Sequence, residues 1–185
     1  MTHLVARRTA GWVGAALVGA LVSVALGVYG AVHTPSGGAI ATFGFGDLIS
    51  MKVWLASAVG VLALSQLITA LWLFGRLGLR VPRHLGTVHR LVGLATVLLS
   101  LPVAYHCLWS LGFQSYDARV LVHSVLGCLV YGVLVTKVIA LHTGSAPGWL
   151  VPLAGGLLFT ALVLTVLTSA LWYFASFGMP GASPY

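Results

Sequence analysis

Long apolar stretches alternate with short polar breaks along almost the whole chain. The breaks hold much of the Gly, Pro, Ser and Arg content, and the apolar stretches cover roughly residues 12–32, 50–75, 87–110, 119–142 and 149–174. Each stretch reaches about the 20 residues that a helix needs to cross the hydrocarbon core. The pattern therefore predicts an all-α membrane protein, with five transmembrane helices packed as a bundle in one domain over residues 1–185.

Composition supports this prediction and excludes a soluble domain. The chain is 59% hydrophobic and 6% charged, whereas soluble domains carry about 25% charged residues. A transmembrane barrel is excluded as well, because its strands would be about ten residues long and would alternate apolar and polar positions. The first apolar stretch follows "ARR" and is 21 residues long. It exceeds the h-region of a signal peptide, so we expect a retained helix.

Basic residues set the expected orientation. With the N-terminus inside and the C-terminus outside, seven basic residues lie toward the cytoplasm and two lie near the outer side, as the positive-inside rule requires. The cytoplasmic residues are Arg7, Arg8, Arg76, Arg80, Arg83, Arg90 and Lys137, and the outer ones are Lys52 and Arg119. The net charge of +7 thus indicates the topology of a multi-pass protein of the plasma membrane. We expect lipid as its surroundings and no nucleic-acid partner.

Histidines gather in the third and fourth predicted helices. Of the seven histidines in the chain, these helices hold His89, His106, His123 and His142. The two helices are antiparallel, so His106 and His123 share a depth near the outer surface, and His89 and His142 share one near the inner surface. Ionisable side chains inside a membrane are costly and mark functional sites. The arrangement predicts one site near each surface.

Two imidazoles at one depth fit the two axial ligands of a haem b. A proton relay is the alternative, but it normally includes Asp or Glu, and the two acids of the chain, Asp47 and Asp117, lie in or near outer loops. Zinc or copper needs further ligands at the same depth, and the sequence offers none. We expect two haems, or one if the inner histidines are only solvated. His84 is an alternative inner ligand.

The spacing along each helix agrees with two separate sites. His89 and His106 are 17 residues apart, and His123 and His142 are 19 apart, which is about 25 and 28 Å along a helix axis. Viewed down the helix axis, the second histidine of the third helix is rotated about 100° behind the first, and that of the fourth helix about 100° ahead of the first. Because the helices are antiparallel, the two haems would lie on opposite sides of the hairpin. Pro102 is expected to kink the third helix.

Small and charged residues near the histidines support the haem hypothesis. Two helix starts read H-x-x-x-G, "HRLVG" ending at Gly93 and "HSVLG" ending at Gly127. A glycine one turn from a ligand lets a flat macrocycle lie close to the backbone, although small residues also serve ordinary helix packing. Cations are available for haem propionates, Arg119 and Lys52 at the outer surface and Arg90, Arg83 and Lys137 at the inner surface. Each of them is explained at least as well as a positive-inside residue or a snorkelling side chain.

Other polar residues are interpreted as structural. For Gln66 a hydrogen bond to a neighbouring helix is favoured over a contact with a cofactor or quinone. Cys107 and Cys128 lie in apolar helices without CxxC or zinc spacing, and we interpret them as small buried hydrophobic residues. A disulfide between the third and fourth helices is compatible with the sequence, but nothing in it requires one.

On these residues the chain resembles the small di-haem b-type membrane cytochromes, which include the cytochrome b561 group and ferric-reductase-like transmembrane domains. The resemblance covers the second to fifth helices and rests on the two H-x-x-x-G starts and the depth-matched histidines. The eukaryotic b561 group differs in spreading its ligands over four helices, and ferric reductases space theirs more closely. The whole chain, with "LPVAYHCLW" and "LTSALWYF", also looks like small five-helix actinobacterial membrane proteins of unassigned function.

The resemblance implies electron transfer across the membrane, as a membrane subunit of an oxidoreductase. It implies a quinol or a redox protein as the partner, because the sequence has no flavin or nicotinamide motif. Two other interpretations stay open. One is a haem-free structural or assembly subunit of a larger membrane complex. The other is a transporter or channel, which needs a polar path that the first, second and fifth helices do not provide.

Overall fold

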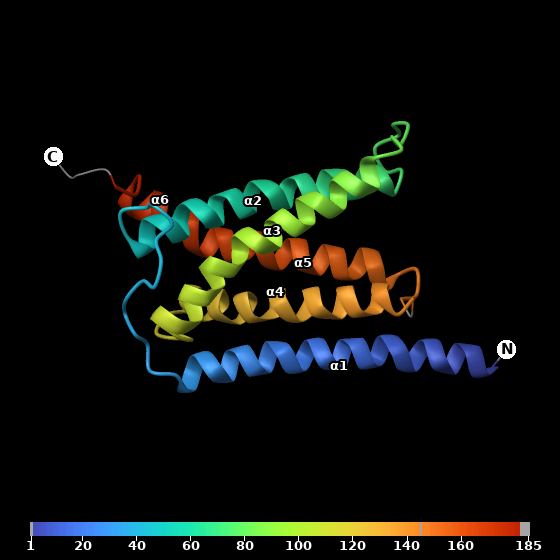
Figure 1. The fold of residues 1–185 in the computed structure, drawn as a ribbon, viewed down its shortest axis with the longest axis horizontal. Coiled ribbons are helices and arrows are strands. Elements are labelled where there is room, and N and C mark those ends of the chain that lie inside the picture. Colours follow the sequence, from blue (N-terminus) through green and yellow to red (C-terminus); the bar gives the residue numbers. More distant parts are fainter. Residues whose placement is uncertain (1, 145, 182–185) are drawn as a thin grey trace. The chain divides into compact units, whose positions relative to one another are not determined.

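The computed structural model describes residues 2–144 and 146–181, with side chains from Thr9 onward, so the side chains of Arg7 and Arg8 lie outside the described part. The regular elements are α1 (Thr2–Val32), α2 (Leu48–Leu73), α3 (Leu85–His106), the π-helix η1 (Cys107–Leu111), α4 (Ala118–His142), α5 (Leu150–Val166), the π-helix η2 (Leu167–Leu171) and α6 (Trp172–Phe177). Five helical spans of 24 to 28 residues are long and apolar enough to cross a membrane (Figure 1). The predicted all-α membrane fold with five spans is confirmed.

The helix bounds differ from the sequence pattern in a few places. α1 begins at Thr2 rather than near residue 12, because "THLVARRTA" contains several residues of good helix propensity. The third and fifth spans each include a π-helix, which the apolar pattern does not reveal. η1 begins five residues after Pro102, a residue that has no N–H and interrupts the regular hydrogen-bond ladder.

Aspartates begin two of the spans. Asp47 precedes α2 and accepts a hydrogen bond from the Ser50 backbone N–H at 2.8 Å, and Asp117 precedes α4 and accepts one from the Val120 N–H at 2.7 Å. Each bond satisfies an N–H group that has no partner within the helix. Hydrogen bonds from the hydroxyl and backbone of Ser50 hold the pKa of the Asp47 carboxyl below its usual range. Both acidic residues of the chain thus serve helix starts.

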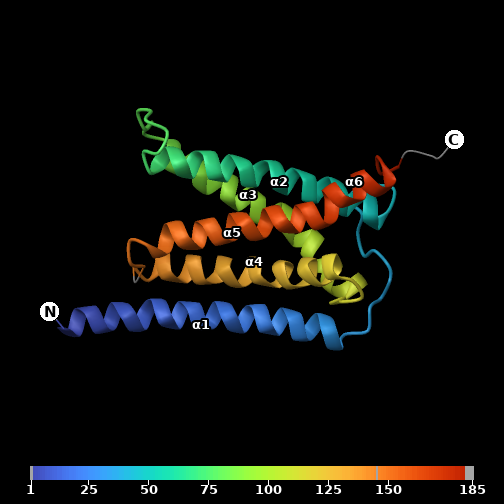
Figure 2. The same cartoon turned by 180° about the vertical axis from the view of Figure 1, so that it is seen from behind.

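Contacts divide the chain into two units. The α1/α4 unit contains residues 1–34 and 112–165, and the α2/α3 unit contains residues 35–111 and 166–185. Within the α1/α4 unit, α4 lies between α1 and α5 (Figures 1 and 2). The predicted single domain over residues 1–185 stays a prediction.

α1 and α4 approach so closely that glycines meet. A Cβ at Gly19 would overlap the Thr136 hydroxyl and the Gly132 carbonyl, and a Cβ at Gly132 would overlap Ser23. The Ser23 hydroxyl donates to the carbonyl oxygen of Cys128 at 3.2 Å. Small residues that let two backbones approach are a common means of packing membrane helices. This seam therefore fixes α1 against α4.

α2 and α3 form an antiparallel hairpin in the α2/α3 unit (Figure 2). The end of the fifth span also packs on α2, because a Cβ at Gly60 would lie 3.3 Å from Val166. The rings of Trp54 and Phe174 meet edge to face with their centroids 5.8 Å apart. Residues 35–46, between α1 and α2, are bonded to the α3–η1 end of the hairpin, where one of the predicted ligands lies.

Candidate functional site

The four predicted ligands lie on the helices that the sequence assigns to them. His89 and His106 are near the two ends of α3, His123 is in the second turn of α4, and His142 is its last residue. His106 is 2% exposed, His89 and His123 are half-buried, and His142 is exposed. Each predicted pair takes one histidine from each unit, and the two pairings stay predictions.

His106 engages both of its ring nitrogens. Nδ1 lies 2.8 Å from the carbonyl oxygen of Pro102, which only accepts hydrogen bonds, so Nδ1 carries the proton. Nε2 accepts a hydrogen bond from the Ile40 backbone N–H at 3.3 Å, so it carries the lone pair. The two bonds assign the neutral tautomer with its proton on Nδ1. An Nδ1–H held by a backbone carbonyl is also how proteins orient metal-ligating histidines.

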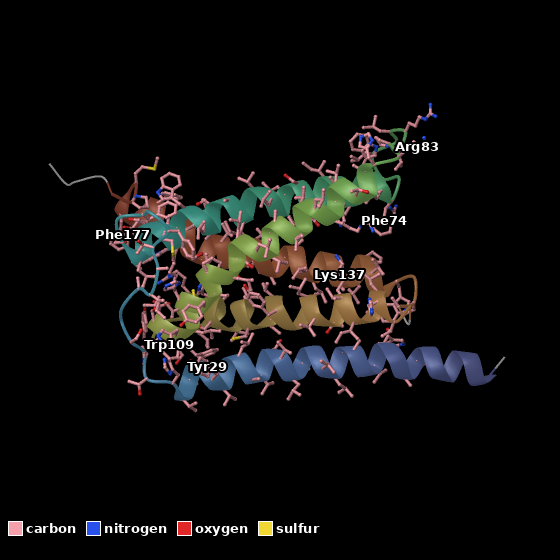
Figure 3. All side chains as sticks on the ribbon, in the orientation of Figure 1. Tyr29, Phe74, Arg83, Trp109, Lys137 and Phe177 are labelled. Atoms are coloured by element: carbon pink, nitrogen blue, oxygen red, sulfur yellow. The ribbon has the colours of Figure 1, made fainter. Side chains whose placement is uncertain are left out.

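A loop segment, residues 36–43, covers His106, and we call it the strap. Besides the bond from Ile40, three hydrogen bonds attach the strap to η1 (Trp109 in Figure 3). They run from the Ser36 N–H to the Trp109 carbonyl oxygen (3.2 Å), from the Gly37 N–H to the Ser110 carbonyl oxygen (3.0 Å) and from the Ser110 hydroxyl to the Gly38 carbonyl oxygen (2.7 Å). The last carbonyls of a helix have no partner within it. The strap therefore acts as a cap for this helix end.

An apolar groove of about 350 Å³ lies between the strap and α3. Its lining residues are Ile40, Ala41 and Phe43 from the strap and Leu101, Pro102, Tyr105 and His106 from α3. Phe43 has a φ of 50°, in the left-handed region that is uncommon for residues other than glycine, and it is 65% exposed. The groove thus presents apolar surface around one imidazole whose nitrogens are both hydrogen-bonded.

His89 is held by the neighbouring helix α2. The Thr69 hydroxyl donates to the Ser65 carbonyl oxygen at 2.8 Å, and on that basis we assign its oxygen as the acceptor of the Nδ1–H of His89, which lies 2.8 Å away. The Gln66 amide donates to the His89 carbonyl oxygen at 2.6 Å, which confirms the helix–helix hydrogen bond predicted for Gln66. Sequence reasoning missed Thr69, although its i, i+3 spacing from Gln66 puts both on one helix face.

The two glycines of the H-x-x-x-G patterns have different surroundings. A Cβ at Gly93 would lie 3.3 Å from the side-chain oxygen of Gln66, so this glycine makes room for the amide that reaches His89. Among the described residues, a Cβ at Gly127 would meet no atom within 4 Å. Gly93 therefore serves helix packing, and a macrocycle beside either glycine stays a prediction.

The two arginines predicted to bind propionates lie near helix ends. The Arg119 side chain is 28% exposed, and its guanidinium is 3.8 Å from the carboxylate of Asp117, the cap of the same helix. Arg90 is exposed, and its Nε donates to the Gly86 carbonyl oxygen at 3.3 Å. Both cations are near a solvent surface, as an anion-binding role requires, and their contact with a propionate stays a prediction.

Cysteines and acids add no further donor set. No disulfide joins Cys107 and Cys128. Among the side chains that the structure describes, no three of the His, Cys, Asp or Glu type form a group that could hold a metal ion. The four histidines remain the predicted donor set, and their pairing stays a prediction.

Comparison with known families places the chain among its relatives. Residues 12–181, almost the whole length, match a family of unknown function. The chain belongs to this family, DUF6529. Searches of curated proteins and of solved structures found no match. Membership in DUF6529 assigns no activity, and the resemblance to di-haem cytochromes stays a prediction.

Proposed function

We propose that this DUF6529 protein is a b-type cytochrome of the cell membrane that carries electrons between two haems. His106 and His123 would ligate one haem, and His89 and His142 the other. The observation that supports this most is how α3 holds its imidazoles. Nδ1 of His106 donates to a backbone carbonyl and Nδ1 of His89 to a hydroxyl. This assignment puts the lone pair on Nε2 at both ends of one span, as an axial ligand requires.

The donor chemistry at His106 fits an axial ligand if the strap withdraws. Nε2 now accepts from the Ile40 amide at 3.3 Å. A hydrogen bond of this kind contributes about 0.5–1.5 kcal/mol net, whereas a structural zinc site contributes about 10–16 kcal/mol. Losing one loop hydrogen bond is therefore a small cost beside metal coordination. The apolar groove walls suit the face of a macrocycle.

Each part of the chain has a role in this proposal. The Pro102 carbonyl and the Thr69 hydroxyl orient the imidazoles and raise their basicity. Arg119 and Arg90 bind the propionates. Bound haem supplies an iron that takes up and releases one electron. The electron partner is a membrane quinol or a docked redox protein, because the sequence has no flavin or nicotinamide motif. We therefore propose a role as the membrane subunit of an oxidoreductase.

A second candidate is a haem-free structural or assembly subunit of a larger membrane complex. The bond between Nε2 of His106 and the Ile40 amide favours it, because this contact gives the imidazole a structural task. In that case the histidines maintain the helix ends, and no chromophore is bound.

A reduced-minus-oxidised absorbance spectrum of the purified full chain, with haem quantified per chain, tests the proposal. The chain is expressed with ample haem supply, as wild type and as His106→Ala, His123→Ala and the control His33→Ala. His33 lies beyond α1 and stacks on Tyr29. We expect two low-spin b haems in the wild type and the control, and one in each of the other variants.

His123→Ala separates ligation from folding. The strap hydrogen bonds run to His106, Trp109 and Ser110, and this variant leaves all three residues unchanged. A haem-free wild type would overturn the proposal and favour the structural subunit. Unchanged haem in both His106→Ala and His123→Ala would overturn the pairing.

A further inference from the structure

Lys137 carries a charge inside a membrane span. It lies five residues before the end of α4 at His142, which is about 7.5 Å along the axis, and its side chain is half-buried. A Cβ built at Gly155 of α5 would be 3.9 Å from its Nζ, and Gly155 is five residues into α5. The ammonium therefore stays near the depth of its own backbone, between α4 and α5 (Figure 3).

Both acidic side chains of the chain, Asp47 and Asp117, are engaged with partners other than Lys137. The two acids cap helix starts: Asp47 binds Ser50, and Asp117 binds Val120 and lies near Arg119. Asp117 is 20 residues from Lys137 along α4, about 30 Å away. Among the described residues, none gives the Lys137 ammonium a hydrogen bond or an ion pair. A second copy of the chain would offer Lys137 the same two aspartates, which cap helix starts in that copy as well.

Two consecutive residues of α5 beside Lys137 carry no side chain. They are Gly155 and Gly156, and a Cβ at Gly156 would meet no described atom within 4 Å. We call this position, where no α5 side chain covers the ammonium, the notch. Lys137 lies at a shallow depth in the membrane. α4 has 25 residues and is about 37 Å long, whereas the hydrocarbon core is about 30 Å thick. If α4 is centred in the membrane, the Lys137 backbone lies about 4 Å inside the core.

We propose that the notch at Lys137 and Gly155 binds the phosphate of an anionic phospholipid from the leaflet at the inner end of α4. An ammonium offers three hydrogen-bond donors, and a phosphate offers acceptor oxygens and the negative charge that would neutralise it. Basic pockets between helices on the cytoplasmic side are known sites for anionic headgroups. By the predicted topology, this is also the leaflet that faces most of the Arg residues, whose field attracts anionic lipid.

Native mass spectrometry of the full chain tests this site. The detergent-purified protein is mixed with phosphatidylglycerol or with phosphatidylcholine of the same acyl chains. We expect Lys137→Met to weaken retention of one phosphatidylglycerol about fivefold, the equivalent of about 1 kcal/mol per basic residue near the membrane surface. Lys137→Arg keeps the charge and should retain the lipid. Lys52→Met, which removes the same charge near the other membrane surface, should retain it as well.

Two further arms test the position of the site and the source of the phosphate. Gly155→Leu fills the notch while keeping Lys137, and we expect it to lower phosphatidylglycerol retention as Lys137→Met does. Inorganic phosphate in millimolar excess should leave the bound lipid in place. Equal retention by wild type and Lys137→Met would overturn the proposal, as would displacement by inorganic phosphate. Unchanged retention in Gly155→Leu would overturn the position between α4 and α5.

Discussion

The two ends of α3 hold an imidazole in different ways. At one end, Thr69 of the packed helix α2 holds His89. At the other, His106 is held by Pro102 of its own helix and by Ile40 of the strap. A packed helix is a rigid support, whereas a loop opens at a lower free-energy cost. The imidazole of His89 is thus held by a rigid support, whereas Nε2 of His106 is held by a loop contact that a ligand could replace.

Removing the imidazole at the strap end should have the largest effect. His106→Ala removes an imidazole that is 2% exposed and takes the acceptor from the Ile40 N–H, and the loss of one such hydrogen bond costs about 0.5–1.5 kcal/mol. We expect a lower unfolding temperature in detergent and faster amide hydrogen exchange over residues 36–40. His33→Ala is the control and should behave as wild type. A strap as protected in His106→Ala as in wild type would show that this imidazole does not hold it.

Removing the amide instead of the imidazole sharpens the comparison. Ile40→Pro deletes the N–H donor and keeps His106, and Ile40→Val keeps the N–H with a similar side chain. We expect faster exchange over residues 36–38 in Ile40→Pro only. Haem content should remain at the wild-type level, because the amide would hold Nε2 only while no iron is bound. Loss of a haem in Ile40→Pro would contradict the idea of a replaceable contact.

The packed end should respond more mildly. Thr69→Val removes the oxygen that accepts from His89 Nδ1, and hydrogen bonds between membrane helices contribute about 0.6 kcal/mol on average. Under the proposed function, the ligand also becomes less basic, so the midpoint potential of one haem should rise. Redox titration followed by absorbance measures this, with Ser65→Ala as the control, since the Ser65 hydroxyl donates to the Val61 carbonyl oxygen of its own helix. An unchanged potential would argue against His89 as a ligand.

The smallest effect is expected where the segment after the strap joins α2. Asp47→Asn removes the charge that Ser50 stabilises. Because the pKa of Asp47 is lowered by folding, its carboxylate adds stability above the unfolded pKa of about 3.9 and loses this contribution as pH falls through the folded pKa. Wild type should therefore unfold at a higher temperature than Asp47→Asn at pH 7, and the difference should shrink as the pH falls below the unfolded pKa and through the folded pKa. Asp117→Asn, which removes the charge of the other aspartate cap, is the control. It should leave amide hydrogen exchange over residues 36–46 unchanged.

The five spans were predictable because lipid imposes a simple requirement. A span needs enough apolar residues and internal backbone hydrogen bonds, and both are visible along the chain. Gln66 was predictable for a similar reason, since an amide in a span needs a partner, and its bond to the His89 carbonyl supplies one. The π-helices were not predictable, because η1 and η2 continue the apolar pattern that precedes them.

The histidine partners show where sequence reasoning ends. Depth along a helix follows from counting residues, so the placement of His89 and His106 near opposite ends of α3 was correct. Hydrogen bonds depend on which segments fold back, and the strap is a Gly-rich loop without periodicity. The group that bonds His106 is the backbone amide of Ile40. A backbone amide is present in almost every residue, so the sequence does not reveal this contact. Gly93 accommodates Gln66, a contact fixed by the register of α2 against α3, and its position beside a cofactor stays a prediction.

The glycine seam between α1 and α4 has a consequence for synthesis. α1 ends at Val32 and α4 begins at Ala118, so about 85 residues separate them on the ribosome, or roughly 4–17 s at about 5–20 residues per second. During that interval Gly19 faces lipid or the insertion machinery, while α2 and α3, adjacent along the chain, are free to pair. The helix made first therefore finds its partner late, and a chaperone that shields Gly19 and Ser23 would act in this interval.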